Sequence, residues 1–325
     1  MIGAEGKPYL EAGQWQMNLG FRYQYSDRHF VGHDHRSNRD REGSNVRNYI
    51  YLFDIGFTYG IDDRDSVSFS IPYLIARRSS QYEIDAAGNH DRRWQSAQGV
   101  GDFTATLRRW MFDPKENPDG NIQLGFGIKL PTGSPDEEDA RPSFNPDTGE
   151  VENEVRTVDQ SIQPGDGGFG FLIDLSSFYR MGSFTPYLAG VYLFNPEETN
   201  HVRTYRGGAG EAEMSIPDAY LLRVGTLFGD AALGPFTLGL GARWEGTPVN
   251  DLIGGSNDFR RPGYAISAEP QVYYTSPSGN DTLSLAVPIA LDRTRQQSNP
   301  DRDNDRHGDA AFADWMLLLG WTHKF

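Results

Sequence analysis

The sequence predicts an all-β fold, a transmembrane up-and-down barrel of twelve antiparallel strands with long extracellular loops and short periplasmic turns. Three observations predict it. Apolar and polar residues alternate in twelve segments, short and long connections alternate between those segments, and no apolar run is long enough for a membrane-spanning helix. Such a helix needs roughly 18 to 20 consecutive apolar residues. The 325-residue chain has a net charge of −15 and a mean hydropathy of −0.59, so a helical membrane protein is excluded.

The first segment shows the alternation most clearly. Between residues 14 and 25, every second position is apolar, at Trp15, Met17, Leu19, Phe21, Tyr23 and Tyr25. Period two is typical of a strand with one apolar and one polar face. Twelve residues exceed the usual length of a soluble strand but suit a tilted strand that crosses a bilayer.

Eleven further segments repeat this pattern along the chain. The fourth loses its alternation around Arg109 and Trp110, and the seventh is apolar on both faces, so its register is left open. In order, they are residues 49–59, 67–75, 103–110, 122–130, 169–175, 184–194, 220–228, 236–244, 264–274, 283–291 and 313–325. Aromatics near the segment ends would form the interfacial girdles of a membrane barrel.

The connections sort by length. Short turns rich in Gly, Asp, Asn and Pro stand at Ile61–Arg64, Pro114–Gly120, Met181–Ser183, Ala231–Gly234 and Pro277–Asn280. Six long polar loops are expected at 26–46, 78–99, 132–166, 195–218, 247–262 and 292–310. Short turns at one rim and long loops at the other are typical of outer-membrane barrels. A soluble β-sandwich or lipocalin-like barrel would not sort its loops in this way.

Both ends of the chain fit a protein of the outer membrane. We expect a single domain over 1–325, with 1–12 as a periplasmic segment and 13–325 as the barrel. No charged region followed by an apolar run begins the chain, so we expect the mature form after removal of a signal peptide. Cysteine is absent, which suits passage through the oxidising periplasm. The alternating last segment ends on Phe325, which resembles the carboxy-terminal signal that the outer-membrane assembly machinery recognises.

If the apolar residues face lipid, the residues between them line the lumen. Five basic and five acidic groups are expected there, as a hydrated pore or as a salt-bridge network, because charges in a low-dielectric interior must pair or be hydrated. They are Arg22, Asp54, Arg108, Lys129, Asp174, Arg223, Arg243, Glu245, Glu269 and Asp314.

Excess negative charge lies in the loops, where it would be solvated or would bind divalent cations that bridge lipopolysaccharide. The last loop has acidic residues at alternate positions, which makes Asp301, Asp303, Asp305 and Asp309 a candidate calcium site. The pattern lacks the glycine and the final acid of a calcium loop, since Arg306 and Phe312 stand there. No cofactor is expected, and no nucleic-acid-binding pattern is present.

Three segments resemble the family of outer-membrane barrels named after the MetA pathway of phenol degradation, whose members are described as transporters. They are 60–73 (GIDDRDSVSFSIPY), 101–104 (GDFT) and 125–133 (GFGIKLPTG). The resemblance implies a barrel that takes up aromatic or other hydrophobic compounds.

An internal repeat also relates 65–72 to 281–288, and both copies end on a proline, Pro72 or Pro288. Proline cannot donate to the ladder, so we expect a bulge or kink at each.

Three functions remain open on the sequence. The first is a channel for passive passage of small solutes, including hydrophobic or aromatic compounds. The second is a non-conducting structural barrel, or one that binds a partner at the surface. The third is a lipid hydrolase, for which His35, Ser37 and Asn38 offer a superficial match in a polar loop, with His29 and His33 nearby. Because nothing holds these groups in register, we expect no enzyme and assign no catalytic residue.

Overall fold

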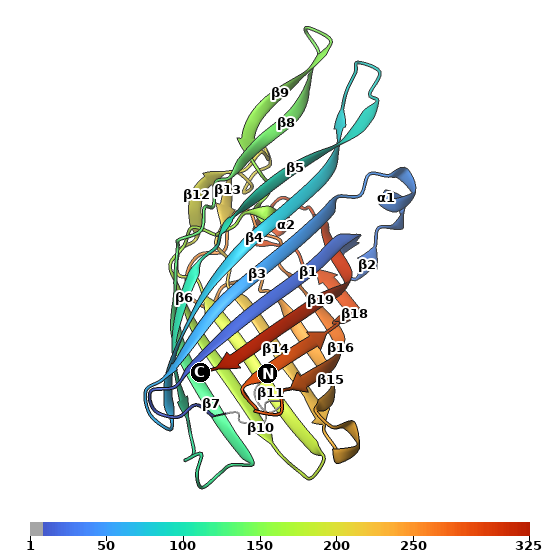
Figure 1. Ribbon diagram of the computed structural model, residues 1–325. Coiled ribbons are helices and arrows are strands. Elements are labelled where there is room, and N and C mark those ends of the chain that lie inside the picture. The colour runs from blue at the N-terminus through green and yellow to red at the C-terminus, as the bar shows by residue number, and fades with distance from the viewer. Residues whose placement is uncertain (1–8) are drawn as a thin grey trace.

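The computed structural model describes residues 9–325, which form a closed antiparallel barrel of twelve strands and so confirm the predicted fold class. The first strand, β1 (Trp15–Val31), pairs with the last, β19 (Ala310–Lys324), and this pairing closes the barrel (Figure 1). The other strands of the wall are β3 (Arg47–Gly60), β4 (Asp65–Glu83), β5 (His90–Val100), β6 (Phe103–Trp110), β7 (Gly120–Leu130), β10 (Gly170–Tyr179), β11 (Phe184–Phe194), β14 (Ala219–Phe228), β15 (Phe236–Thr247), β16 (Gly263–Thr275), β17 (Asp281–Ala286) and β18 (Ile289–Arg295).

Two of the twelve barrel strands are interrupted, and both interruptions lie beside the prolines of the internal repeat. Pro288 separates β17 from β18, as expected for a residue without a backbone donor. Pro72 stays inside β4, and the neighbouring strand breaks instead, between β5 and β6, where the Gly101 N–H donates to the Pro72 carbonyl at 2.8 Å. A Cβ on Gly101 would lie 2.9 Å from the Pro72 ring and from the Pro164 carbonyl oxygen, so only glycine fits there.

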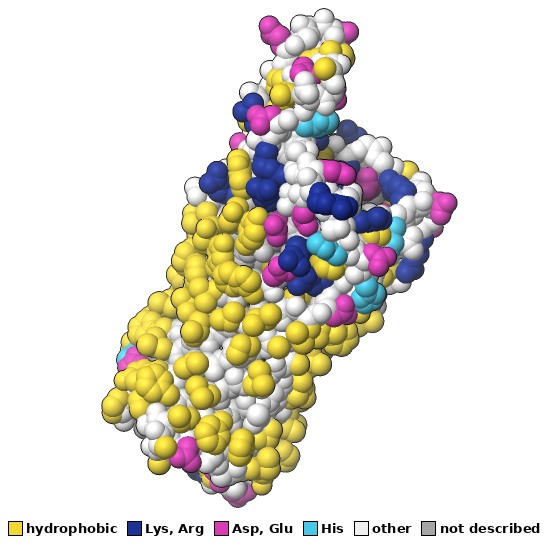
Figure 2. Space-filling view, turned by 90° about the vertical axis from the view of Figure 1, so that its right-hand side faces the viewer, with side chains coloured by type: hydrophobic (Ala, Val, Ile, Leu, Met, Phe, Trp, Pro, Cys, Tyr) yellow, Lys and Arg dark blue, Asp and Glu magenta, His cyan; other side chains and the backbone are white. Residues whose placement is uncertain are grey.

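The apolar face of the wall points outward. Leu124 is 43% exposed and Phe126 is 57% exposed, whereas Gln123, directly before Leu124, is 6% exposed. Apolar side chains cover the lower body in Figure 2, and charged side chains gather above them. This distribution matches strands with one face toward lipid and one toward the lumen. Among residues 9–325, no helix is long and apolar enough to cross a membrane.

The ambiguous seventh segment has a clear register in the structure. Along β11, Phe184 is 52% exposed, while Tyr187 is only 4% exposed and its hydroxyl accepts a hydrogen bond from the Gln271 amide at 2.6 Å. Tyr187 therefore faces inward. It belongs to an apolar cluster at the short-turn end of the lumen, which contains Trp110, Phe178, Tyr187, Leu227 and Tyr273, with Tyr9 packed against it.

The long connections contain more regular structure than predicted. The prediction of a loop over 78–99 is wrong in its bounds. In the structure, β4 continues to Glu83 and β5 begins at His90, so these residues form a projecting hairpin (Figure 1). Outside the bilayer both faces of a strand contact water, so the alternation that marks a spanning strand is absent there. The other loops hold β2 (Asp34–His35), α1 (Ser37–Glu42), β8 (Glu138–Asn145), β9 (Glu150–Thr157), η1 (Gln160–Ile162), β12 (Thr199–Arg203), β13 (Glu213–Ser215) and α2 (Asn299–Asp303), and η2 (Ala231–Leu233) lies in a short turn.

Candidate functional site: the lumen of the barrel

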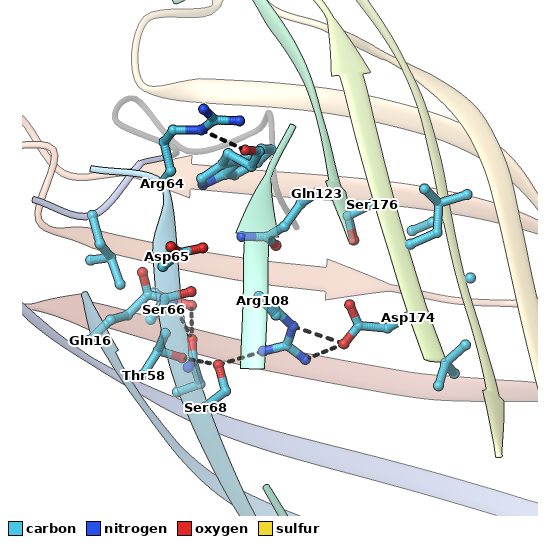
Figure 3. Close-up of a pocket in the computed structure, with 18 of the residues that line it drawn as sticks. Gln16, Thr58, Arg64, Asp65, Ser66, Ser68, Arg108, Gln123, Asp174 and Ser176 are labelled. Carbon is cyan, nitrogen blue, oxygen red and sulfur yellow. Dashed lines mark hydrogen bonds and ion pairs between the residues drawn. The ribbon is translucent and has the colours of Figure 1, made fainter. Parts of the chain in front are cut away.

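Residues 9–325 enclose two cavities along the lumen, one toward each end of the barrel. The turn-side cavity, near the short turns, has a volume of about 370 Å³ and is lined by Gln16, Asn18, Arg108, Asp174 and Arg223 among others (Figure 3). The loop-side cavity has a volume of about 870 Å³ and is bounded by wall strands and by the long loops. On β1, Gln16 and Asn18 line the first cavity and Gln24 lines the second. Residues 20 and 22, which point the same way, therefore lie between the two.

The turn-side cavity has both polar and apolar walls, and an ion pair between Arg108 and Asp174 lies on its polar side. Arg108 Nε and Nη2 each lie 2.8 Å from Asp174 Oδ2, and Arg108 also donates to the Ser68 hydroxyl (Figure 3). Gly125 makes room for this pair, because a Cβ there would lie 2.3 Å from Asp174 Oδ1. The Ser68 hydroxyl in turn lies 2.9 Å from that of Thr58. Hydroxyl and amide groups that line this cavity are suited to contact water or a small polar solute.

A band of charged side chains separates the cavities. We call it the charged layer, and it consists of Arg22, Arg223, Arg243, Glu245 and Glu269. Glu269 is 1% exposed and is held between Arg223, which donates to Oε1, and Arg243, whose Nη1 lies 3.5 Å from Oε2. Arg243 also binds Glu245 at 2.7 Å, and the charge of Arg22 acts on Glu245. The layer therefore contains three cations and two anions, of which Arg223, Glu269, Arg243 and Glu245 are connected by ion pairs. Arg22 donates a hydrogen bond to Gln24.

The remaining predicted lumen residues occupy three different settings. Lys129 donates to Asp166 and lies 4.0 Å from Asp102, which ties the base of loop 132–166 to the wall. Asp54 accepts a hydrogen bond from Ser70. Asp314 lies at an irregular stretch of the β1–β19 ladder, where it binds Arg28 at 3.0 Å and Arg293 at 2.8 Å. Within residues 9–325, eight of the ten predicted residues have an ion-pair partner, and Arg22 and Asp54 have none.

Asp159 of loop 132–166 is bound by two arginines that line the loop-side cavity, and this role was not expected from the sequence. It is 2% exposed, caps η1 through the Ser161 N–H, and binds Arg261 through two contacts of 2.7 and 2.6 Å. Arg78 of β4 lies 3.3 Å away, and the Tyr205 hydroxyl donates to it at 3.0 Å. Asp159 thus joins three loops to the barrel wall. Burial opposes its ionisation, but the charges of Arg261 and Arg78 outweigh burial and hold its pKa well below the ordinary value.

Apolar contacts support the same loop. Val158 and Ile162 are both fully buried, and they cover Leu74, Ala76 and Ala97 on the inner wall. These wall residues stand at lumen-facing positions, where water would otherwise contact them. Loop 132–166 therefore folds into the barrel mouth, and the β8–β9 hairpin projects beyond it (Figure 1).

The four acids of the candidate calcium site do not converge. Asp301 binds Arg295 at 2.9 Å and caps α2, whereas Asp309 binds His29 at 3.1 Å and Arg39 at 3.0 Å. Asp303 and Asp305 are exposed. In the described part of the chain, no group of three or more His, Cys, Asp or Glu side chains is arranged to hold a metal ion. Burial of Asp309 is outweighed by the hydrogen bond from His29 and by the charges of His29 and Arg39, which lower its pKa.

The loop that suggested a lipid hydrolase does not assemble a catalytic group. His35 Nε2 lies 3.2 Å from Asp40, and Ser37 begins α1. His33 Nδ1 lies 3.0 Å from Asp292, while His29 is buried and accepts the Val46 N–H at 2.8 Å. Each imidazole thus has its own acidic partner in a different place, and within residues 9–325 no hydrogen bond joins any of the three to Ser37.

Comparison with known proteins shows the fold and not a family. No protein-family model matches the chain, and no curated protein matches its sequence. Among solved structures, the chain is similar to an outer membrane channel from Pseudomonas putida F1, at 12% identity and a TM-score of 0.62 over 99% of this chain and 98% of that one. The P. putida toluene transporter TodX gives 10% identity and a TM-score of 0.49 over 96% and 90%. The translocator domain of the autotransporter NalP from Neisseria meningitidis gives 9% and 0.47 over 98% and 91%. This chain therefore has the fold of an outer-membrane β-barrel.

Proposed function

We propose that this chain is an outer-membrane channel for the passive passage of small solutes, including hydrophobic or aromatic compounds. The observation that carries the proposal is the division of the lumen into two cavities, of about 370 and 870 Å³, by a single charged layer. A water molecule occupies about 30 Å³ in the liquid, so both cavities hold several waters or one small solute. A barrel with a purely structural role has no need of such volume.

The charged layer would set the size of the solute. Arg223 lines the turn-side cavity and also binds Glu269, so a solute that moves aside one ion pair passes from one cavity to the other. Water in both cavities can hydrate the separated charges, which makes the rearrangement less costly than in a dry interior. The narrow layer favours small solutes over large ones.

A preference for aromatic compounds rests on two supports. Tyr82, Tyr205 and Phe312 line the loop-side cavity and offer ring surfaces to a solute. The segments 60–73, 101–104 and 125–133 resemble the phenol-degradation family, and we propose membership of that family. The outer membrane channel from P. putida F1 shares the fold over nearly its whole length.

We also propose outer-membrane lipid, lipopolysaccharide and the outer-membrane assembly machinery as partners. The outward apolar belt supports the lipid contact. Phe325 is 66% exposed and its N–H donates to the Trp15 carbonyl at 2.9 Å, so the last residue is fixed at the end of the closing strand with its ring accessible. An accessible terminal aromatic is what a recognition signal requires.

A non-conducting structural barrel is the second candidate. It is favoured by the apolar cluster that fills part of the turn-side lumen around Trp110 and Phe178, and by Tyr9, whose ring lies 4.8 Å from that of Trp110. The turn-side cavity nevertheless reaches the end of the barrel beside this cluster, since Leu10 and Asp62 also line it. This position of the cavity supports a route past the cluster.

The test uses the purified chain in proteoliposomes and planar bilayers. We expect single-channel currents in potassium chloride and faster influx of benzyl alcohol than in protein-free liposomes. Folded protein that gives neither current nor influx would support the structural barrel. The same liposomes should show no phospholipid hydrolysis. Hydrolysis would support the lipid hydrolase that the sequence analysis left open.

A further inference from the structure

The loop-side cavity has more guanidinium groups than carboxylates to neutralise them. Arg78, Arg141, Arg206 and Arg261 all line it. Three of them, Arg78, Arg206 and Arg261, lie within 4.0 Å of the Asp159 carboxylate. Arg261 binds Asp159 with both terminal nitrogens, Arg78 lies 3.3 Å from it, and Arg206 lies 4.0 Å from it. Arg141 has no ion pair in residues 9–325, and its Nη1 is buried without a hydrogen-bond partner. Arg206 Nε is unpartnered in the same way.

The other acids near this cavity do not supply the missing charge. Each already has a basic partner, which is Lys129 for Asp166, Arg39 for Asp309 and Arg306 for Glu211. Arg206 lies 4.0 Å from both Asp159 and Glu211, so neither carboxylate forms a close ion pair with it. The excess positive charge is thus concentrated on Arg141 and Arg206.

Aromatic rings hold these two guanidinium groups in place. Arg141 lies over the Tyr205 ring at 3.9 Å and 5.6 Å from the Tyr82 ring. Arg206 lies 5.3 Å from the Tyr205 ring and 4.5 Å from that of Phe259. A guanidinium that stacks on a ring keeps its edge N–H groups free to bind a planar anion. The cavity therefore combines flat apolar walls with donors fixed at their edges.

We propose that the loop-side cavity binds an aromatic carboxylate. Arg141 and Arg206 bind its carboxylate, and its ring packs against Tyr82 and Tyr205. This site names a substrate class for the channel proposed above, and its biological role rests on that channel, although binding itself does not. A neutral aromatic amide of the same shape offers the guanidinium groups one acceptor oxygen and no negative charge, so it binds more weakly.

The test is isothermal titration of the folded full-length chain in detergent at pH 7, with benzoate and its neutral analogue benzamide. Benzoate should bind about 10-fold more tightly, since a hydrogen bond to a charged group is worth roughly that factor. Arg141→Gln should weaken benzoate binding by about 10-fold and leave benzamide binding unchanged. Arg206→Gln should act in the same direction without altering the β8–β9 hairpin.

Arg156→Gln is the matched control, because Arg156 is on the neighbouring strand β9, half exposed and paired with Glu154 outside the cavity. It should leave both affinities unchanged. Equal affinity for benzoate and benzamide, or equal losses in Arg141→Gln and Arg156→Gln, would overturn the site. A chain that passes benzyl alcohol but does not bind benzoate also overturns this inference and leaves the channel intact. A chain that binds benzoate but passes no solute supports the site and contradicts the channel.

Discussion

The two ends of the lumen are partly closed by different kinds of interaction. At the turn side, an apolar cluster packs Trp110, Phe178 and Tyr187, with the Trp110 and Phe178 ring centroids 6.2 Å apart. At the loop side, a buried carboxylate, Asp159, is bound by arginines of which Arg261 lies 102 residues away. The first closure depends on the shape of side chains, and the second on paired charge.

The two closures also differ in where their residues come from. The apolar cluster belongs to the wall strands themselves, such as β6, β10 and β11, so it cannot be removed without disturbing the barrel. The Asp159 network belongs mainly to loops, with Arg78 of β4 as the wall contact. The turn side should therefore be linked to global stability, and the loop side to opening and closing of the mouth.

The largest effect on global stability should come from Trp110→Ala. Trp110 is 5% exposed, and replacing a buried tryptophan by alanine costs about 3 to 5 kcal/mol because a cavity remains. Urea unfolding in lipid vesicles measures the change. Trp94→Ala is the control, since Trp94 is 38% exposed and its contact with Arg77 is worth about 1 kcal/mol or less. Equal losses of unfolding free energy in the two variants would mean that the turn-side cluster does not contribute a hydrophobic core to the barrel.

Asp159→Asn should free the loops and leave the barrel folded. Without the carboxylate, Arg78 and Arg261 are left unpaired, which should destabilise docking of loop 132–166 by about 3 kcal/mol. Trypsin should then cut the β8–β9 hairpin faster, while the folded barrel keeps its mobility on gels. Asp147→Asn, at the exposed tip of that hairpin, should have no effect. A loss of barrel stability comparable to that of Trp110→Ala would contradict the division between the two closures.

The pH dependence of the mouth follows from the same carboxylate. The pKa of Asp159 is lowered in the folded chain, so its contribution is present above the ordinary Asp pKa of about 3.9 and is lost as pH falls through the lowered value. Each pH unit in that range is worth about 1.4 kcal/mol. Bilayer currents should therefore be steady from pH 7 to about pH 4 and become noisier below it. A transition between about pH 5 and pH 7 would contradict Asp159 as the group that sets the pH dependence of the mouth.

The smallest stability effect is expected at the charged layer. Glu269→Gln leaves Arg223 and Arg243 with less negative charge. Because Arg223 lines the turn-side cavity, water there would hydrate it, and the cost should be about 1 kcal/mol. The current should shift toward anions because the layer becomes more positive. A loss of about 3 to 5 kcal/mol with unchanged selectivity would show a dry, packed layer.

The alternation of residue types was enough to predict the wall. Leu124 and Phe126 face outward because the lipid selects apolar side chains at every second position. The same reasoning could not separate the two faces of β11, where Tyr187 is apolar and yet faces the lumen. An inward aromatic cluster breaks the rule that the lumen is polar, and no local pattern marks it.

The loop-side site could be predicted only in part. Aspartate is a common residue at the start of a helical turn, and Asp159 caps η1 by accepting a hydrogen bond from the Ser161 N–H. Its partners Arg78 and Arg261 lie on other segments of the chain, and only the folding of the loops brings them together. In the lumen, the alternation predicted that Arg223 and Glu269 both face inward, and the structure pairs them. It could not predict that Arg22 contacts Gln24 and has no ion-pair partner among residues 9–325.

Thiol labelling along β1 tests the divided lumen most directly, since the chain contains no cysteine. Gln24 lines the loop-side cavity, Asn18 lines the turn-side cavity, and Leu19 is on the outer face. A membrane-impermeant thiol reagent added from the loop side should modify Gln24→Cys quickly, Asn18→Cys slowly, and Leu19→Cys not at all in a bilayer. Modification of Leu19→Cys with protection of both Gln24→Cys and Asn18→Cys would contradict a lumen made of two water-filled cavities.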